Sequence, residues 1–268
     1  MRGRLIARAS ATALLLTLPG SADEAGAAEL TARQITLQLF QASAASPVDF
    51  SGKNLQGLDL SGLDFKRARL SGSDLFGADL AGADLTGADL SAARLDRIVI
   101  IGARFDGANL AGASLLRPTT FSTLEARASE APSFVACDLT GAKLFGRLNG
   151  VNLARANLEG ASLAPFGRTG FIEHLWRTEL VGADLSEANL AGADLTHVSF
   201  RFASLRGANL RGARFRKADL SHADLTGADL SHADLLEADL DGAILRDVKG
   251  LDTVAGLDHA LNRAKAIE

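Results

Sequence analysis

A chain of 268 residues, 47% hydrophobic and 22% charged, has enough apolar side chains to bury a core. Its formal net charge of −4 argues against binding to nucleic acid through phosphate contacts. Cys137 is the single cysteine, which excludes an internal disulfide and any metal site built from several cysteines. The chain has 27 Gly and 13 Phe but no Tyr, and such a skewed composition indicates a repeat.

The first residues predict a secretory signal peptide. Three arginines lie among the first eight residues, an apolar run extends from Ala9 to Leu18, and the first acid is Asp23. A basic start, a short apolar segment and a small-residue exit are typical of such signals, and a membrane-spanning helix needs about 20 residues. We expect a signal peptide over residues 1–22, with cleavage as late as residue 27, and export to a bacterial periplasm. The alternative is a transit peptide that directs the chain to an organelle lumen.

Residues 29–46 have the pattern of a short helix. Thr31 and Gln34 fit a capping box, and Ile35 and Leu39 lie on one face. We predict an N-terminal capping helix that covers the first coil of the repeat described next, because an open terminal coil exposes unpaired strand edges.

The rest of the chain repeats with a period of five. From Phe50 to Leu115, with Ile100 as the exception, and again from Leu175 to Leu245, every fifth residue is Leu or Phe. A small residue stands two positions earlier, Asp or Asn lies between them, and Gly often follows two positions later. A period of five fits neither a helix nor a flat strand, so the chain must turn once per repeat to bury every Leu. The pattern predicts a coil with five-residue sides, stacked about 4.8 Å apart, with Gly at its corners.

The tandem A-(D/N)-L-x-x motif over residues 48–117, 132–163 and 178–247 resembles the pentapeptide-repeat family. The resemblance implies an all-β solenoid, a right-handed quadrilateral β-helix with four pentapeptides per coil; the spacing alone leaves the number of sides open. It also implies two kinds of interaction that are known for some members of the family. Some members resemble B-form DNA and bind type II topoisomerases, and some form homodimers through the C-terminal end.

Two interruptions break the repeat region, which we place at residues 48–247. They lie near 118–131 and 164–177, and between Leu144 and Leu153 the register slips by one residue. These segments are expected to be loops or bulged corners on a regular solenoid. Residues 248–268 abandon the period, and we predict a C-terminal cap of one or two short helices over the last coil.

The second interruption is the candidate partner-binding site, because aromatic residues and Arg are enriched in binding hot spots and loops on a rigid scaffold often carry function. The candidate residues are Phe166, Arg168, Phe171, His174, Trp176 and Arg177. An alternative stays open. Phe166, Phe171 and Trp176 are five residues apart, so this segment is also consistent with a degenerate run of repeats that fills the gap in the coil.

The sequence offers no catalytic, metal or cofactor site. His222 and His232 are ten residues apart, which places them on opposite faces of a four-sided coil. No G-x-S-x-G, P-loop, dinucleotide-binding or H-E-x-x-H motif occurs. The acidic residues are spread around the coil and are not paired in a cleft, so general acid–base chemistry has no evident location. We therefore expect a protein that is not an enzyme and has no cofactor.

The charge pattern argues against a DNA-like surface. With twenty residues per coil, Arg interrupts several acidic columns, and four further arginines form a positive girdle on successive corners. The columns are Asp49–Arg69–Asp89, Asp74–Arg94, Asp84–Arg104 and Asp194–Arg214–Asp234, and the girdle is Arg201, Arg206, Arg211 and Arg216. Such a surface is mixed in charge, whereas mimicry of DNA requires broad negative faces.

The sequence thus favours an exported, non-enzymatic scaffold that binds a protein partner of unknown identity. We expect no direct contact with nucleic acid, no membrane span after removal of the signal, and either a monomer or a homodimer through the C-terminal end. The alternative is a cytoplasmic DNA mimic that binds a type II topoisomerase such as gyrase.

Overall fold

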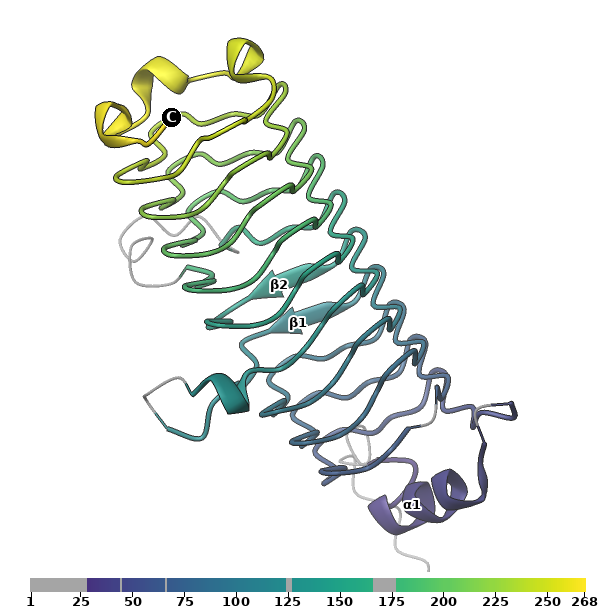
Figure 1. The fold of residues 1–268 in the computed structure, drawn as a ribbon. Coiled ribbons are helices and arrows are strands. Elements are labelled where there is room, and N and C mark those ends of the chain that lie inside the picture. The colour runs from purple at the N-terminus through teal and green to yellow at the C-terminus, as the bar shows by residue number, and fades with distance from the viewer. Residues whose placement is uncertain (1–27, 44, 66, 124–126, 166–176) are drawn as a thin grey trace, which may run out of the picture.

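The computed structural model describes residues 28–43, 45–65, 67–123, 127–165 and 177–268, which form a long solenoid (Figure 1). Parallel bridges join residues 20 positions apart, as in Asp59 with Asp79 and Asp79 with Val99. Within one coil the bridged residues are five apart, at Asp59, Asp64, Arg69 and Asp74. Each regular coil therefore has four sides, which answers the question that the spacing left open.

Each corner is a tight turn built from the repeat motif. At a representative corner the Ala83 N–H donates to the carbonyl of Leu80 at 3.0 Å, and Gly82 has a φ of +65°. A positive φ at the third residue is the mark of a type II turn and suits glycine. Asp79 adds a second bond, because its Oδ1 accepts from the Ala81 N–H at 2.8 Å. The Asp, Leu and Gly of the motif thus act together to turn the chain.

The apolar positions form one continuous core along the axis. Leu80, Ala83 and Leu85 are all 0% exposed, as the inward assignment of Leu and Ala predicted. The rings of Phe105 and Phe134 stack in successive coils with their centroids 4.8 Å apart. Burial of a Leu side chain contributes about 1.5–3 kcal/mol, so this column supplies the main stabilisation of the fold.

Helix α1 (Ala32–Gln41) lies at the N-terminal end of the solenoid (Figure 1). It begins with a capping box, in which the Thr31 hydroxyl accepts from the Gln34 N–H and the Gln34 side chain accepts from the Thr31 N–H. Ile35 and Leu39 are buried and belong to the same hydrophobic core as Phe50. The helix therefore covers the apolar end of the first coil.

Regular strands are short. Strand β1 (Ser114–Leu116) precedes the first interruption, strand β2 (Lys143–Phe145) follows it, and the two pair in parallel. The 3₁₀ helix η1 (Ala128–Glu130) lies in the first interruption. The interruptions lengthen single coils. The bridge from Asn109 reaches Asp138, and the one from Asn152 reaches Asp184. Between them Ser133 bridges Asn152, 19 residues away, which is the predicted slip of one residue.

The C-terminal tail does not form one or two helices over the last coil, as the sequence predicted. It forms one more coil whose bridges fall every six residues, and each corner contains a single 3₁₀ turn. The turns are η2 (Leu251–Thr253), η3 (Leu257–His259) and η4 (Arg263–Lys265), and the bridged residues are Lys249, Ala255, Leu261 and Ile267. The added residue lengthens each corner enough for one 3₁₀ turn. The loss of the five-residue period therefore marks longer sides and not the end of the solenoid.

The predicted signal peptide, residues 1–22, lies outside the described residues. Among the helices that the structure does describe, none has the length and apolar character needed to cross a membrane.

Candidate functional site

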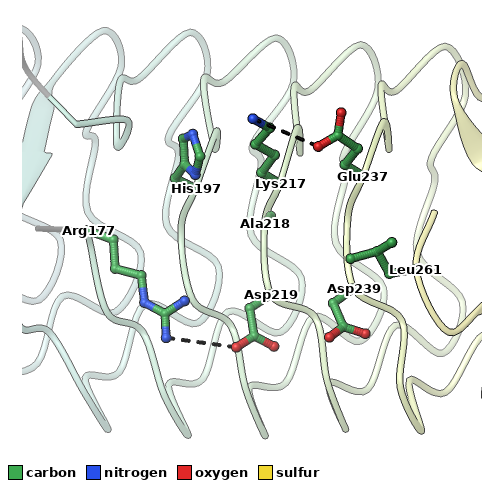
Figure 2. A pocket seen from close by; sticks show the side chains of 8 residues that line it. All are labelled: Arg177, His197, Lys217, Ala218, Asp219, Glu237, Asp239 and Leu261. Carbon is green, nitrogen blue, oxygen red and sulfur yellow. Dashed lines mark ion pairs between the residues drawn. The ribbon is translucent and has the colours of Figure 1, made fainter. Parts of the chain in front are cut away.

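A pocket of about 300 Å³ lies along one corner of the solenoid, beside the point where the second interruption rejoins the coil (Figure 2). We call it the corner pocket. It is lined by Arg177, His197, Lys217, Ala218, Asp219, Glu237, Asp239 and Leu261.

The coil period places four of these residues in one line. Arg177, His197, Lys217 and Glu237 are each 20 positions apart, so they occupy the same corner in successive coils, and Figure 2 shows the last three in a row. His197, Lys217 and Glu237 have φ values of 62°, 56° and 58°, in the left-handed region that glycine adopts with the least strain. A side chain in this conformation costs about 1–2 kcal/mol per residue. The corner therefore keeps polar side chains at some expense in stability.

Opposite charges face one another across the corner pocket. Lys217 Nζ lies 3.8 Å from Glu237 Oε2, and Arg177 Nη2 lies 3.9 Å from Asp219 Oδ2 (Figure 2). Arg201 Nε approaches the same carboxylate of Asp219 at 4.0 Å. These pairs are long and partly exposed to solvent, so each contributes about 0–1 kcal/mol. Their side chains can exchange an internal partner for an external one at little cost.

The structure describes one of the six residues predicted for partner binding. Arg177 is exposed and lines the corner pocket; the others, Phe166, Arg168, Phe171, His174 and Trp176, lie outside the described residues. The other residues of the corner pocket were not predicted from the sequence, because they lie outside the second interruption. The signal was the 20-residue interval that links Arg177 to His197 and Lys217.

The predicted charge columns are present in the predicted register. Every neighbouring pair in these columns is bridged. The ion pairs have N–O distances of 4.0 Å for Arg69–Asp49, 3.2 Å for Arg94–Asp74, 3.6 Å for Arg104–Asp84 and 3.2 Å for Arg214–Asp194. The Arg girdle is also paired, each member with a carboxylate of the next coil. These pairs are Arg201–Asp219, Arg206–Asp224, Arg211–Asp229 and Arg216–Asp234.

Cys137 and the corner histidines His222 and His232 make structural contacts. Cys137 is buried, its Sγ–H donates to the carbonyl of Phe105, and burial raises the pKa of the thiol to about 12, so it stays neutral near pH 7. His222 and His232 occupy corners with positive φ, and the His222 ring stacks on Phe202 at 5.1 Å. Within the described ranges, no three His, Cys, Asp or Glu residues come together as metal ligands.

A second pocket, of about 410 Å³, lies at the first interruption. It is lined by Pro118, Thr119, Thr120, Phe121, Ser122, Thr123 and Arg147. The Thr120 hydroxyl donates to the Arg147 carbonyl at 3.0 Å, which ties this segment to the next coil.

The family model for pentapeptide repeats matches residues 48–82, 78–115, 178–216 and 208–247, with eight copies. The chain belongs to the pentapeptide repeat family. Membership implies a right-handed quadrilateral β-helix, in agreement with the four-sided coil of this pentapeptide repeat protein. No curated protein matches the sequence.

Three solved pentapeptide repeat or related proteins are similar to this chain. HetL from the cyanobacterium Nostoc sp. strain PCC 7120, described as involved in heterocyst differentiation regulation, is 31% identical; the match covers 84% of this chain and 90% of HetL, with a TM-score of 0.45. QnrB1, a plasmid-mediated fluoroquinolone resistance protein, is 21% identical, with 76% and 92% covered and a TM-score of 0.38. A protein of the Arabidopsis thaliana thylakoid lumen is 23% identical, with 60% and 71% covered and a TM-score of 0.15.

Proposed function

We propose that this pentapeptide repeat protein is an exported, non-enzymatic scaffold that binds a protein partner. The observation that carries the proposal is the pairing of surface charges in register along a stiff solenoid. Arg and Asp side chains neutralise one another between successive coils, as in Arg214–Asp194 and Arg206–Asp224. The corner pocket interrupts this regular surface and offers polar side chains to a partner.

The same observation weighs against a DNA mimic that binds a topoisomerase. A protein surface that replaces DNA needs continuous negative charge, because the DNA backbone carries one charge per about 1.7 Å of axis. Here Arg69, Arg94, Arg104 and Arg214 each stand between or beside carboxylates of the neighbouring coils. The charge pattern of this chain favours neither a role in regulation like that of HetL nor a role in fluoroquinolone resistance like that of QnrB1.

Export follows from the proposed signal peptide over residues 1–22, with a bacterial periplasm as the destination and an organelle lumen as the alternative. The test is fractionation of the expressing cells, with mass spectrometry of the mature N-terminus. We expect a periplasmic product that begins at residue 23, or as late as residue 28. The matched variant Leu14→Arg/Leu16→Arg interrupts the apolar run and should retain the uncleaved chain in the cytoplasm. An uncleaved cytosolic wild type that inhibits DNA supercoiling would favour the DNA mimic instead.

The proposed assembly is a monomer or a homodimer through the C-terminal end. The last coil exposes Leu261 at 52% and Ile267 at 44%, which gives this end an apolar surface. Light scattering on the purified protein distinguishes the two states, and cross-linking in intact cells followed by mass spectrometry identifies the partner.

A further inference from the structure

The corner pocket is a slot between two rows of side chains (Figure 2). One row stands on the turn residues of the corner, with His197, Lys217 and Glu237 in successive coils. The other row lies on the adjoining face, where Asp219 and Asp239 are bridged neighbours. The slot therefore runs along the axis of the solenoid, and a ligand in it meets new side chains at each coil, about every 4.8 Å.

The two ends of the slot differ in charge. Lys217 and Arg177 lie toward the end at which the second interruption rejoins the coil. Asp219 lies within 4.0 Å of both Arg177 Nη2 and Arg201 Nε, so two guanidinium groups compensate its carboxylate. This end of the slot is therefore positive.

The other end is negative, and Asp239 supplies a carboxylate there that takes part in none of the ion pairs among the described residues. Its Oδ1 accepts hydrogen bonds from the Asp241 N–H at 3.1 Å and from the Asn262 side-chain amide at 2.8 Å. Asp239 also stacks on Asp219 of the preceding coil. Adjacent like charges destabilise a ladder, so a positively charged group that binds beside Asp239 is favoured.

The ion pairs within the pocket leave room for the hydrogen bonds of a ligand. Lys217 Nζ lies 3.8 Å from Glu237 Oε2, and Arg177 Nη2 lies 3.9 Å from Asp219 Oδ2. Charge-assisted hydrogen bonds have lengths of about 2.7–2.9 Å, so both pairs are too long to be hydrogen-bonded. A ligand that binds between these partners forms hydrogen bonds that the pairs themselves do not make.

We propose that the corner pocket binds an α-amino acid with an apolar side chain. Its carboxylate is held by Lys217 and Arg177, and its ammonium group by Glu237 and Asp239. The ammonium and the carboxylate of such a ligand share one carbon atom, and the charge of the pocket changes sign within one coil step, from Lys217 to Glu237. The volume of about 300 Å³ lies at the small end of the range for ligand pockets and suits a molecule of this size.

The apolar contact comes from Leu261, which is bridged to Asp239 in the next coil and is 52% exposed. Figure 2 shows it beside Asp239 at the end of the slot, while the buried Ala218 lies between the two rows. A ligand with a single charge fits less well, because an anion meets Asp239 and a cation meets Lys217. Both charges of a zwitterion are needed to match the two ends.

The test is titration of the full-length protein with leucine and two analogues by isothermal titration calorimetry. N-acetyl-leucine lacks the ammonium group and leucine amide lacks the carboxylate, while both keep the side chain. We expect saturable binding of one leucine per chain and about tenfold weaker binding of each analogue, because each loses charge-assisted hydrogen bonds. No saturable binding of leucine up to about 10 mM overturns the proposal. Equal affinity for leucine and either analogue overturns it in favour of a site for a single charge.

Two variants assign the ends of the slot. Asp239→Asn keeps the oxygen that accepts from the Asp241 N–H and removes the charge, so it should weaken binding of leucine about tenfold without weakening that of N-acetyl-leucine. In Lys217→Gly, glycine suits the φ of 56°, and binding of leucine should weaken while that of leucine amide does not. Weakening of all three ligands by the same factor in either variant contradicts the assignment of that end.

The matched control is Asp79→Asn. Asp79 is bridged to Asp59, accepts from the Ala81 N–H and lies outside the corner pocket, so this variant also removes one stacked carboxylate. Its affinity for leucine should stay within twofold of wild type, and melting temperatures verify that all three variants are folded. Equal weakening by Asp239→Asn and Asp79→Asn contradicts a site at the corner pocket. A small-molecule site goes beyond the proposed scaffold function, and none of these outcomes bears on export or on the protein partner, which fractionation and cross-linking test separately.

Discussion

Each residue of the pentapeptide has a separate physical task. Leu85 and Ala83 are inward and fully buried, whereas the Asp of the motif bonds the backbone of the next turn, as Asp79 does to Ala81. Glycine at the third turn position adopts the left-handed conformation with little strain. Because the tasks are separate, a substitution at one position leaves the others intact, and the repeat tolerates Arg, His, Lys or Glu at single corners.

Cys137 is a core residue that stands where most repeats have Ala, and it gives the protein a pH-dependent stability. Burial raises its pKa in the folded state to about 12, while an unfolded thiol ionises near 8.5. The folded state therefore holds the proton that the unfolded chain releases, and stability falls as pH rises from about 8.5 towards 12.

We expect the free energy of unfolding of the wild type to fall by about 1 kcal/mol per pH unit more than that of Cys137→Ala above pH 9. Urea unfolding of both proteins at pH 7, 9 and 10.5 measures this. Below pH 8 the difference between them should be constant. Parallel decreases for the two proteins over the whole range contradict a buried neutral thiol.

At the scale of the element, the faces of the solenoid are ladders of outward residues about 4.8 Å apart. Carboxylates that stack directly repel one another, as in the bridged pair Asp219 and Asp239, and in other columns an Arg between two Asp residues removes that repulsion. In the column Asp194–Arg214–Asp234, Arg214 Nη2 lies 3.2 Å from Asp194 Oδ2. This column is therefore stabilised less by ion pairing itself than by the absence of adjacent like charges.

Arg214→Asp tests this account, since it places three carboxylates in consecutive coils. We expect a loss of about 1–2 kcal/mol at 20 mM salt, seen as a lower melting temperature, and partial recovery in 1 M NaCl, where the Debye length is about 3 Å. Arg214→Ser removes the attraction without adding repulsion and should cost about 0–1 kcal/mol at either salt concentration. Identical melting of the Asp and Ser variants at low salt contradicts the argument.

At the scale of the whole molecule, a solenoid has an apolar axis that must be closed at both ends. Helix α1 closes the N-terminal end with Ile35 and Leu39, and the six-residue coil that ends near Ile267 closes the other. The outer face of α1 exposes Leu37 and Phe40 at 51% and 81%, so the helix buries one apolar face and exposes apolar side chains on the other.

We predict that Ile35→Asp/Leu39→Asp detaches α1 and destabilises the fold by about 3 kcal/mol or more, because two buried side chains are lost. The matched variant Leu37→Asp/Phe40→Asp changes exposed positions of the same helix and should stay within about 0.5 kcal/mol of wild type. Urea unfolding gives the energies, and gel filtration reports association through the opened coil. A comparable loss in both variants contradicts the role of α1 as the closure of the core.

Much of the architecture was predictable from the sequence, because it depends on contacts that recur at fixed intervals. Period five with Leu80 and Leu85 both inward requires a corner in every repeat. The interval of 20, which the resemblance to the pentapeptide-repeat family implies, places Arg214 between Asp194 and Asp234, and the bridges confirm it. The capping box of Thr31 and Gln34 was also readable, because its bonds are local.

The tertiary structure decided what depends on three-dimensional closure. Four sides and not three follow from which residues bridge, and a five-residue period is compatible with either number. The tail has no five-residue period, yet Ala255 and Leu261 pair with the coil before it, because a longer side can still reach the same ladder. The corner pocket likewise joins Arg177 to Lys217 and Asp219 only once successive coils are stacked. Sequence by itself determined the local turn and its buried side chains, whereas the stacking of coils brought together residues that are distant along the chain.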